Sequence, residues 1–247
     1  MDGFVLVIFL LATFIGGLSS GLTGFAMGMV LNGIWLHILA PVEATTLIVG
    51  YGLITQSYAI WKLRHALSLR SVAPFIIGGT VGVPVGTMLL TYINPAYLRA
   101  GVGVLLVAYS IYNLAQPAFA PVRAGFPANV GVGVLNGMLG GLTGLTGITV
   151  TIWCQLLGLP KDNQRTVFQP VNLAGIVMAA VSLTVAGAVT AELAKLYLLG
   201  LPLLLLGLWC GFKLYGKLDD VTFRTVVLVM LLVSGLMLAV PGLISLP

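Results

Sequence analysis

A short glycine–threonine motif occurs twice in this chain, each time within a long apolar stretch. Gly21-Leu22-Thr23-Gly24 recurs 120 residues later as Gly141-Leu142-Thr143-Gly144. A second motif, Gly82-x3-Gly86, recurs 125 residues later as Gly207-x3-Gly211. Two motifs that recur at nearly the same offset indicate an internal duplication. The duplication predicts a first repeat, a linker and a second repeat over 1–114, 115–127 and 128–247.

Charged residues make up only 7% of the 247 residues, against about 25% in soluble globular domains. So few charges cannot cover the surface of a soluble protein of this size. The apolar stretches run for about 20 residues, as transmembrane helices do, whereas barrel strands alternate apolar and polar residues over about ten positions. The sequence therefore predicts an all-α, multi-pass protein of the plasma (cytoplasmic) membrane, with the lipid bilayer as its partner.

The apolar stretches divide into five helical segments in each repeat, and an odd number places the two repeats in opposite orientations. The segments run roughly over 3–20, 22–39, 43–61, 71–91 and 96–114 in the first repeat, and over 128–143, 145–158, 166–188, 195–214 and 221–241 in the second. The basic residues agree with this reading. If the loop holding Lys62, Arg64 and Arg70 is cytoplasmic, nine of the eleven basic residues fall on the cytoplasmic side, and only Arg99 and Lys195 do not. We therefore expect inverted-topology repeats, with both termini on the non-cytoplasmic side.

The first two segments of each repeat are short. In the second repeat, residues 128–158 must enter the membrane and return with no polar loop at the turn. Each arm would be about 23 Å long, against a hydrocarbon core of roughly 30 Å. The arms are either short, tilted spans or a re-entrant hairpin whose tip stops inside the membrane, and we favour the hairpin. Irregular backbone at that depth is tolerated where it is buried in protein or lines a wet cavity.

The glycine–threonine motif at such a turn is suited to an anion. Glycine permits a tight turn, and the helix that follows presents free N–H groups and the positive end of its dipole. The threonine hydroxyl adds a donor without a charge. Two tips from inverted repeats would enclose one small anion near the membrane midplane. The alternative, that these glycines only pack helices closely, stays open here and is favoured for Gly82, Gly86, Gly207 and Gly211.

The candidate substrate-binding residues are glycines and neutral polar residues at or near the two turns, together with amides in the third segment of each repeat. They are Gly21, Thr23, Gly24, Gln56, Gly141, Thr143, Gly144, Thr146, Gln169 and Asn172. Pro170 frees a carbonyl and bends its helix, which can open a cavity beside Gln169 and Asn172. The alternative for each amide is that it bridges two helices.

The sequence lacks the residues that several other functional classes require. All six acidic residues lie in loops or at segment ends, so there is no buried carboxylate to carry a proton, and their absence from the apolar segments suits an anionic substrate. There is no nucleotide-binding loop and no metal-ligand cluster, so we expect no cofactor and no metal. The basic residues form no stripe for nucleic acid. No credible catalytic set exists, and we expect no enzyme.

Several short motifs are similar to those of a known family. They are Gly16-Gly17 through Gly28, Pro41-Val42-Glu43-Ala44-Thr45, Gly82 to Gly86 and Leu98-Arg99, and then Gly137 to Gly147, Pro160-Lys161-Asp162-Asn163, Gly207 to Gly211 and Phe223-Arg224. With these motifs the chain resembles the TauE/SafE sulfite exporter family over nearly its whole length. The resemblance implies transport of small sulfur-containing anions such as sulfite, thiosulfate or organosulfonates.

The leading hypothesis is a secondary transporter, an exporter of such anions, that works by alternating access around a midplane site at the two tips. An anion channel and a non-transporting membrane scaffold are the alternatives. Saturation and competition of the flux would separate a carrier from a channel. Whether the protein forms a homo-oligomer is left open.

Overall fold

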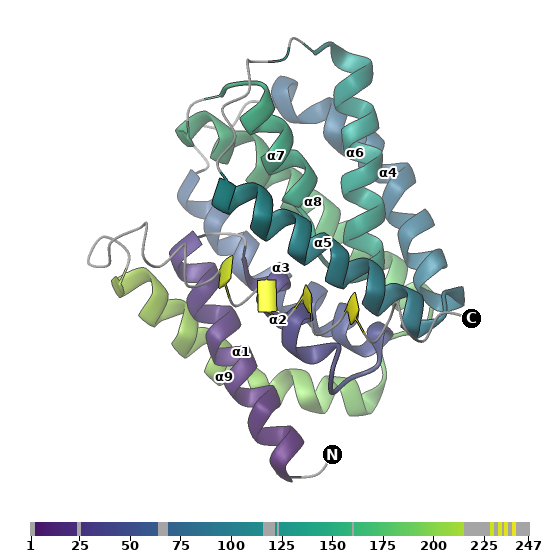
Figure 1. Ribbon diagram of the computed structural model, residues 1–247, viewed down its shortest axis with the longest axis vertical. Coiled ribbons are helices and arrows are strands. Elements are labelled where there is room, and N and C mark those ends of the chain that lie inside the picture. Colours follow the sequence, from purple (N-terminus) through teal and green to yellow (C-terminus); the bar gives the residue numbers. More distant parts are fainter. Residues whose placement is uncertain are drawn as a thin grey trace. The chain divides into compact units, whose positions relative to one another are not determined.

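The computed structural model describes most of the chain as helices joined by short turns (Figure 1). The described residues are 3–23, 26–63, 69–115, 122, 124–159, 161–214, 228–229, 232–233, 235–236 and 239–240. Within them the helices are α1 (Gly3–Thr23), α2 (Met27–Trp35), α3 (Pro41–Leu63), α4 (Leu69–Tyr92), α5 (Pro95–Ala115), α6 (Phe126–Thr143), α7 (Ile148–Leu156), α8 (Lys161–Val185) and α9 (Ala191–Leu214). The expected all-α fold class is confirmed for these residues. The expected last segment, 221–241, falls mostly outside them.

Local sequence signals set several helix starts. At the start of α3, the Glu43 carboxylate accepts a hydrogen bond from the N–H of Ala40 at 3.0 Å, which is one half of a capping box. At the start of α5, Asn94 caps the helix by accepting a bond from the N–H of Ala96 at 2.9 Å. Pro95 is the first residue of α5, a position where its missing N–H costs nothing.

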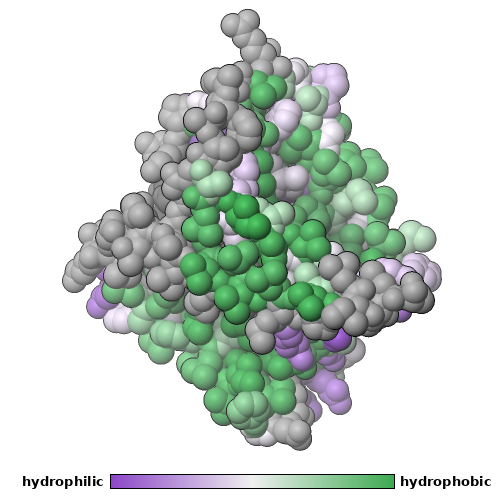
Figure 2. All heavy atoms as spheres, viewed as in Figure 1, coloured by the Kyte–Doolittle hydropathy of each residue, from purple (hydrophilic) through white to green (hydrophobic). Residues whose placement is uncertain are grey.

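Five helices of the described part of the chain are long and apolar enough to cross a membrane. The spans are Gly3–Leu22, Ser71–Tyr92, Pro95–Ala115, Thr166–Val185 and Ala191–Leu214. Their outward faces are apolar as well, for example at Val81, Val85 and Met88 of α4. Apolar side chains also cover much of the face seen in Figure 2. The chain is a multi-pass membrane protein, because such faces are stable in contact with lipid rather than water.

Two of the expected segments are much shorter as helices. The segments expected over 22–39 and 145–158 contain α2 and α7, which have nine residues each. A helix of that length measures about 14 Å, half of the hydrocarbon core. In the second repeat the cause is local. Gly144 and Gly147 have φ angles of 69° and 101°, which keep residues 144–147 out of both helices.

The chain forms two compact units, and each unit combines helices from both sequence repeats. The first unit, residues 1–48, 93–117 and 190–247, holds α1, α2, α5 and α9. The second unit, residues 49–92 and 118–189, holds α4, α6, α7 and α8. Helix α3 begins in the first unit and continues into the second. The expected linker lies between α5 and α6, and part of it falls outside the described residues.

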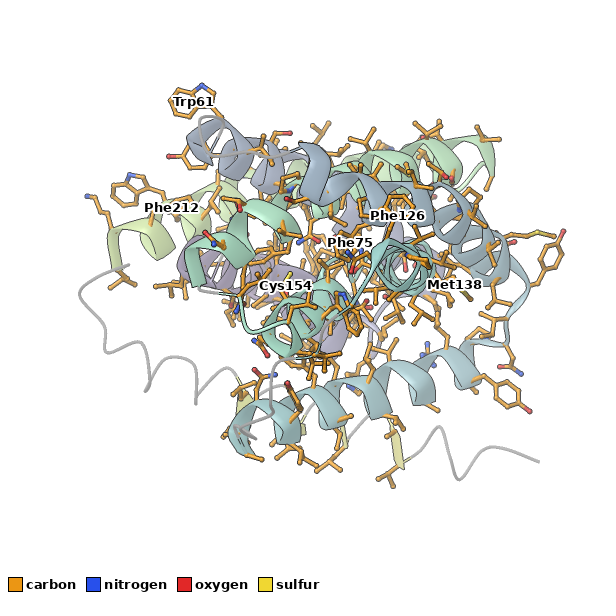
Figure 3. The ribbon with its side chains drawn as sticks, turned by 90° about the horizontal axis from the view of Figure 1, so that it is seen from above. Trp61, Phe75, Phe126, Met138, Cys154 and Phe212 are labelled. Carbon is orange, nitrogen blue, oxygen red and sulfur yellow. The ribbon has the colours of Figure 1, made fainter. Side chains whose placement is uncertain are left out.

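In the second unit, α4 and α6 touch backbone to backbone. A Cβ atom on Gly82 of α4 would collide with the carbonyl oxygen of Val134, and one on Gly141 of α6 would collide with that of Val83. Figure 3 shows the two helices together, with Phe75 marking α4 and Met138 marking α6. Small residues allow such a close approach, which strengthens packing where no hydrophobic effect drives membrane helices together.

In the first unit, α1 and α9 make the same kind of contact. A Cβ atom on Gly207 of α9 would collide with the carbonyl oxygen of Phe14, and one on Gly21 of α1 would collide with that of Leu208. The expectation that Gly82 and Gly207 serve close packing agrees with these contacts. Gly21 and Gly141 are candidate site residues, and their α-carbons lie in these helix contacts, Gly21 against α9 and Gly141 against α4.

The two helix pairs correspond contact by contact. Residues of α1 correspond to residues of α6 that lie 120 positions later, and residues of α9 correspond to residues of α4 that lie 125 positions earlier. By this correspondence, the contact of Gly207 with Phe14 is equivalent to the contact of Gly82 with Val134. In the same way, the contact of Gly21 with Leu208 is equivalent to that of Gly141 with Val83. Each pair joins the first helix of one repeat to the fourth helix of the other. The two helix pairs therefore pack in the same way at positions that correspond under these offsets.

Substitution of Gly82 by alanine should lower the thermal stability of the detergent-solubilised protein. The added methyl group must push α4 away from α6, and overpacking of this kind costs about 1–3 kcal/mol. Gly79→Ala in the same helix is the matched control, because a Cβ atom there meets nothing within 4 Å. We expect Gly79→Ala to melt at or above the wild-type temperature. Equal melting of the two variants would contradict the packing described for α4 and α6.

Candidate functional site

The second glycine–threonine motif lies where α6 ends and α7 has not yet begun. We call residues 143–148 the tip. Gly144 closes α6 in a left-handed conformation and donates a hydrogen bond from its N–H to the carbonyl oxygen of Gly140 at 2.8 Å. Gly147, also left-handed, precedes the first residue of α7. The glycines are required here because a side chain disfavours this conformation.

Helix α7 returns along α6. The N–H of Val122, just before α6, donates a hydrogen bond to the carbonyl oxygen of Leu156, the last residue of α7, at 2.8 Å. The indole N–H of Trp153 donates to Oδ1 of Asn129, near the start of α6, at 2.8 Å. The two ends of this segment therefore lie close together, and the tip is the turning point between them.

The start of α7 lies beside the middle of α6. The N–H of Gly147 donates a hydrogen bond to Oδ1 of Asn136 at 2.8 Å, and the Thr149 hydroxyl donates to the same oxygen at 3.2 Å. Asn136 is the eleventh of the 18 residues of α6. That position is about 15 Å along a helix of about 27 Å. The buried Asn136 amide thus holds the first turn of α7 about halfway along α6.

Thr143 and Thr146 give the tip its shape. The Thr143 hydroxyl donates to the carbonyl oxygen of Leu139 at 2.7 Å and accepts from the N–H of Leu145 at 3.2 Å. The methyl group of Thr146 packs against α6 and α8, where a Cβ atom on Gly140 would approach it to 2.7 Å and one on Gly175 to 3.3 Å. Both candidate residues are buried, and these contacts hold the turn in place.

Two candidate amides of α8 are buried with unused hydrogen-bonding groups. Asn172 is 0% exposed, and neither Nδ2 nor Oδ1 has a partner among the described residues. Its amide lies against the tip, because a Cβ atom on Gly147 would be 2.5 Å from Oδ1. Gln169 is one turn earlier on the same face of α8, 5% exposed, with no partner for Oε1. Groups buried in this state call for an explanation.

The third candidate amide, Gln56, is buried in the part of α3 that belongs to the second unit. One turn before it, Gly52 faces α8, because a Cβ atom there would be 2.8 Å from Cδ1 of Ile176. The structure therefore brings α3 to the helix that carries Gln169 and Asn172. Ile176, the residue of α8 in this contact, lies one turn after Asn172.

The first turn of α7 adds electrostatic character to the tip. The N–H groups of the first residues of a helix have no partner within the helix, and the helix dipole places partial positive charge there. The residue before α7 is Gly147, which has no side chain to cap these groups. Together with the unpaired Asn172 amide, the tip offers several neutral donors to an anion in a buried place.

The candidates at the tip of the first repeat, Gly21, Thr23 and Gly24, belong to the sequence range of the other unit. Gly21 is buried against α9. Thr23 is the last residue of α1, but its side chain, like all of Gly24, lies outside the described residues. Among the candidates, the structure therefore brings together those of the second tip and α8, namely Thr143, Gly144, Thr146 and Asn172, with Gln169 one turn away.

Asn136 was absent from the candidate site residues. Sequence reasoning treated it only as one of several amides in apolar segments, because nothing local distinguishes it. One signal was present in the repeat: the residue at the equivalent position of the first repeat, 120 residues earlier, is Gly16. A polar residue in one repeat at a position where the other repeat has glycine is the sequence signal that distinguishes Asn136.

Comparison with known proteins identifies one family. The family model for the sulfite exporter TauE/SafE matches residues 9–238, nearly the whole chain. No curated protein and no solved structure shows significant similarity to the chain.

Substitution of Asn136 by leucine should destabilise the protein more than Thr149→Val. Leucine leaves the buried N–H of Gly147 without an acceptor, and an unsatisfied buried donor costs about 1–3 kcal/mol. Thr149→Val removes only the second of the two donors and keeps the bond between Gly147 and Asn136. Thermal melting of both variants in detergent measures the difference. A smaller loss for Asn136→Leu than for Thr149→Val would show that this amide does not hold the tip.

Proposed function

The chain belongs to the TauE/SafE sulfite exporter family, and from this membership and the geometry of the tip we propose that it is a secondary transporter that exports small sulfur-containing anions. The substrates in this proposal are sulfite, thiosulfate and organosulfonates. The substrate binds at the second tip, between the first turn of α7 and the Asn172 amide. The observation that carries the proposal is the fully buried Asn172 amide against Gly147, which has no hydrogen-bond partner among the described residues.

The depth of the tip supports a binding site within the membrane. Because α6 is about as long as the hydrocarbon core is thick, the start of α7 beside Asn136 would lie near the midplane. Broken helices whose N-termini point at an anionic substrate near the midplane are a recurrent design of secondary transporters. In this proposal α6, the tip and α7 form the re-entrant hairpin.

The internal duplication supplies a comparison within the molecule. The residues of the first repeat that correspond to Asn136 and Thr151 are Gly16 and Leu31, which contact each other. The backbone packing of the two helix pairs is nevertheless the same. The fold can therefore be built without polar side chains at these positions. Their presence in the second repeat supports a role that is particular to the second tip, where Asn136 holds the start of α7 in place for binding.

The remaining features of the proposal follow from the sequence. The protein lies in the plasma membrane with both termini on the non-cytoplasmic side, as the distribution of basic residues predicts. The two repeats have inverted topology, and the site opens alternately to the two sides of the membrane. Gly21, Thr23 and Gly24 form the tip of the first repeat in this pathway, and Gln56 contributes a polar group.

Uptake into liposomes tests the proposal. Purified protein should give saturable flux of at least one of sulfite, thiosulfate and sulfoacetate, and an excess of unlabelled substrate should compete. Sulfate and chloride serve as controls. Thr23→Val and Thr143→Val should each reduce the flux, the second by loosening the tip. A non-saturable flux would indicate a channel, and no flux of any anion under several ion gradients would overturn the proposal.

Gly147→Ala should abolish saturable flux, whereas Gly187→Ala should retain it. Both glycines have positive φ angles, 101° and 72°, so alanine adds similar backbone strain, roughly 1–2 kcal/mol, at either position. Only at Gly147 does the new methyl group also displace the Asn172 amide, because a Cβ atom on Gly187 meets nothing within 4 Å. Equal flux through the two variants would place the binding site elsewhere. Measured melting temperatures serve as the control that both variants are folded.

A further inference from the structure

Among the described residues, the helix segments that form the second tip carry neutral side chains. Residues 71–92, 126–156 and 166–185, which supply nearly all of α4, α6, α7 and α8, contain no Asp, Glu, Lys, Arg or His. The titratable or charged residues of the helices around the tip are Glu43, Tyr51, Tyr58 and Lys62 of α3, Arg70 and Tyr92 of α4, Cys154 of α7, and Lys161, Asp162 and Arg165 of α8. An anion at the tip is therefore held by dipoles and hydrogen bonds.

Neutral groups can compensate one negative charge far better than two. The cost of moving an ion out of water grows with the square of its charge, so a dianion loses about four times the hydration energy of a monoanion of the same size. A helix N-terminus offers a partial charge of roughly half a unit, and each neutral hydrogen bond adds a modest net contribution. These contributions are of the right size for a single charge.

The unpaired atoms at the tip include acceptors as well as donors. Within the part of the chain that the structure describes, Asn172 has an unused donor at Nδ2 and an unused acceptor at Oδ1, and Gln169 has an unused acceptor at Oε1. The buried Thr151 hydroxyl, one turn into α7, has no partner among the described residues either. A fully deprotonated oxyanion has no hydrogen to offer these acceptors and can use only the donors. An oxyanion that keeps an O–H group can satisfy an acceptor and a donor together.

We propose that the second tip selects singly charged oxyanions, namely hydrogensulfite and monosulfonates, and excludes dianions such as sulfite, sulfate and thiosulfate. This inference rests on the proposed function and narrows its substrate class. A protonated oxyanion donates its O–H to Oδ1 of Asn172 or Oε1 of Gln169 and accepts hydrogen bonds from Nδ2 of Asn172 and the first turn of α7. A monosulfonate uses the same donors and carries one charge.

The pH dependence of transport in liposomes tests the inference. Hydrogensulfite loses its proton near neutral pH, so its share of total sulfite falls about tenfold for each pH unit above that point. The KM for total sulfite should therefore rise about tenfold per unit between about pH 7 and pH 9. The KM for methanesulfonate, which keeps one charge throughout, should stay constant and thereby excludes titration of the protein as the cause. Thiosulfate and sulfate should show no saturable flux.

His37 provides a further control. Partial burial and the nearby charge of Arg99 hold the pKa of His37 below its usual value of 6.5. The imidazole is therefore neutral throughout the tested range, and His37→Gln should leave the sulfite profile unchanged.

A different set of results would overturn the inference. Saturable thiosulfate flux as efficient as that of methanesulfonate, or a sulfite KM that is constant or falls with rising pH, would show that the site accepts two charges. Arg165, two turns before Asn172 in α8, is the nearest basic residue along that helix. If Arg165→Gln removes such dianion flux but keeps methanesulfonate flux, a cation completes the site. Absence of all flux would instead overturn the proposed function, and this inference with it.

Discussion

The fold depends on one constraint of the membrane interior, which is that every backbone polar group must find its partner within the protein. The turn between α6 and α7 interrupts helical hydrogen bonding at residues 144–147, and α7 then begins beside the middle of α6. Asn136 makes this interruption tolerable, because its side-chain oxygen accepts the N–H of Gly147 and the Thr149 hydroxyl. Once the turn is satisfied there, α7 can begin deep in the protein, with its free N–H groups beside the unpaired Asn172 amide.

The glycine-rich helix pairs provide the rigid surroundings for this turn. α4 and α6 approach so closely that even one methyl group at Gly82 or Gly141 would collide with the opposite backbone. The first unit repeats the arrangement in α1 and α9 at equivalent positions. Such contacts fix the position of α6, and therefore of Asn136, relative to α4. The first unit shows that the same packing of the helix pair is possible with Gly16 and Leu31 at the positions that Asn136 and Thr151 occupy in the second unit.

Sequence reasoning was most successful where a pattern repeats along the chain. The scarcity of charge predicted a helical membrane protein, and the recurring glycines predicted helix packing that the contacts of Gly82 and Gly207 bear out. It was weaker where the role of a side chain depends on the path of the backbone. Thr143 matches an anion-binding motif, yet its hydroxyl is engaged with Leu139 and Leu145. Asn136 looked like any other amide, because the sequence does not show that a bond across eleven residues would hold the start of α7.

The central claim is that the start of α7 binds an anion in a water-accessible place within the membrane. Its most direct test places a cysteine at Thr149, which is partly exposed in the first turn of α7, in a protein whose Cys154 and Cys210 are replaced by serine. We expect a membrane-impermeant, negatively charged methanethiosulfonate reagent to modify this cysteine, and saturating methanesulfonate, but not sulfate, to slow the modification. An unreactive cysteine in the folded protein, or a rate that methanesulfonate leaves unchanged, would contradict the claim.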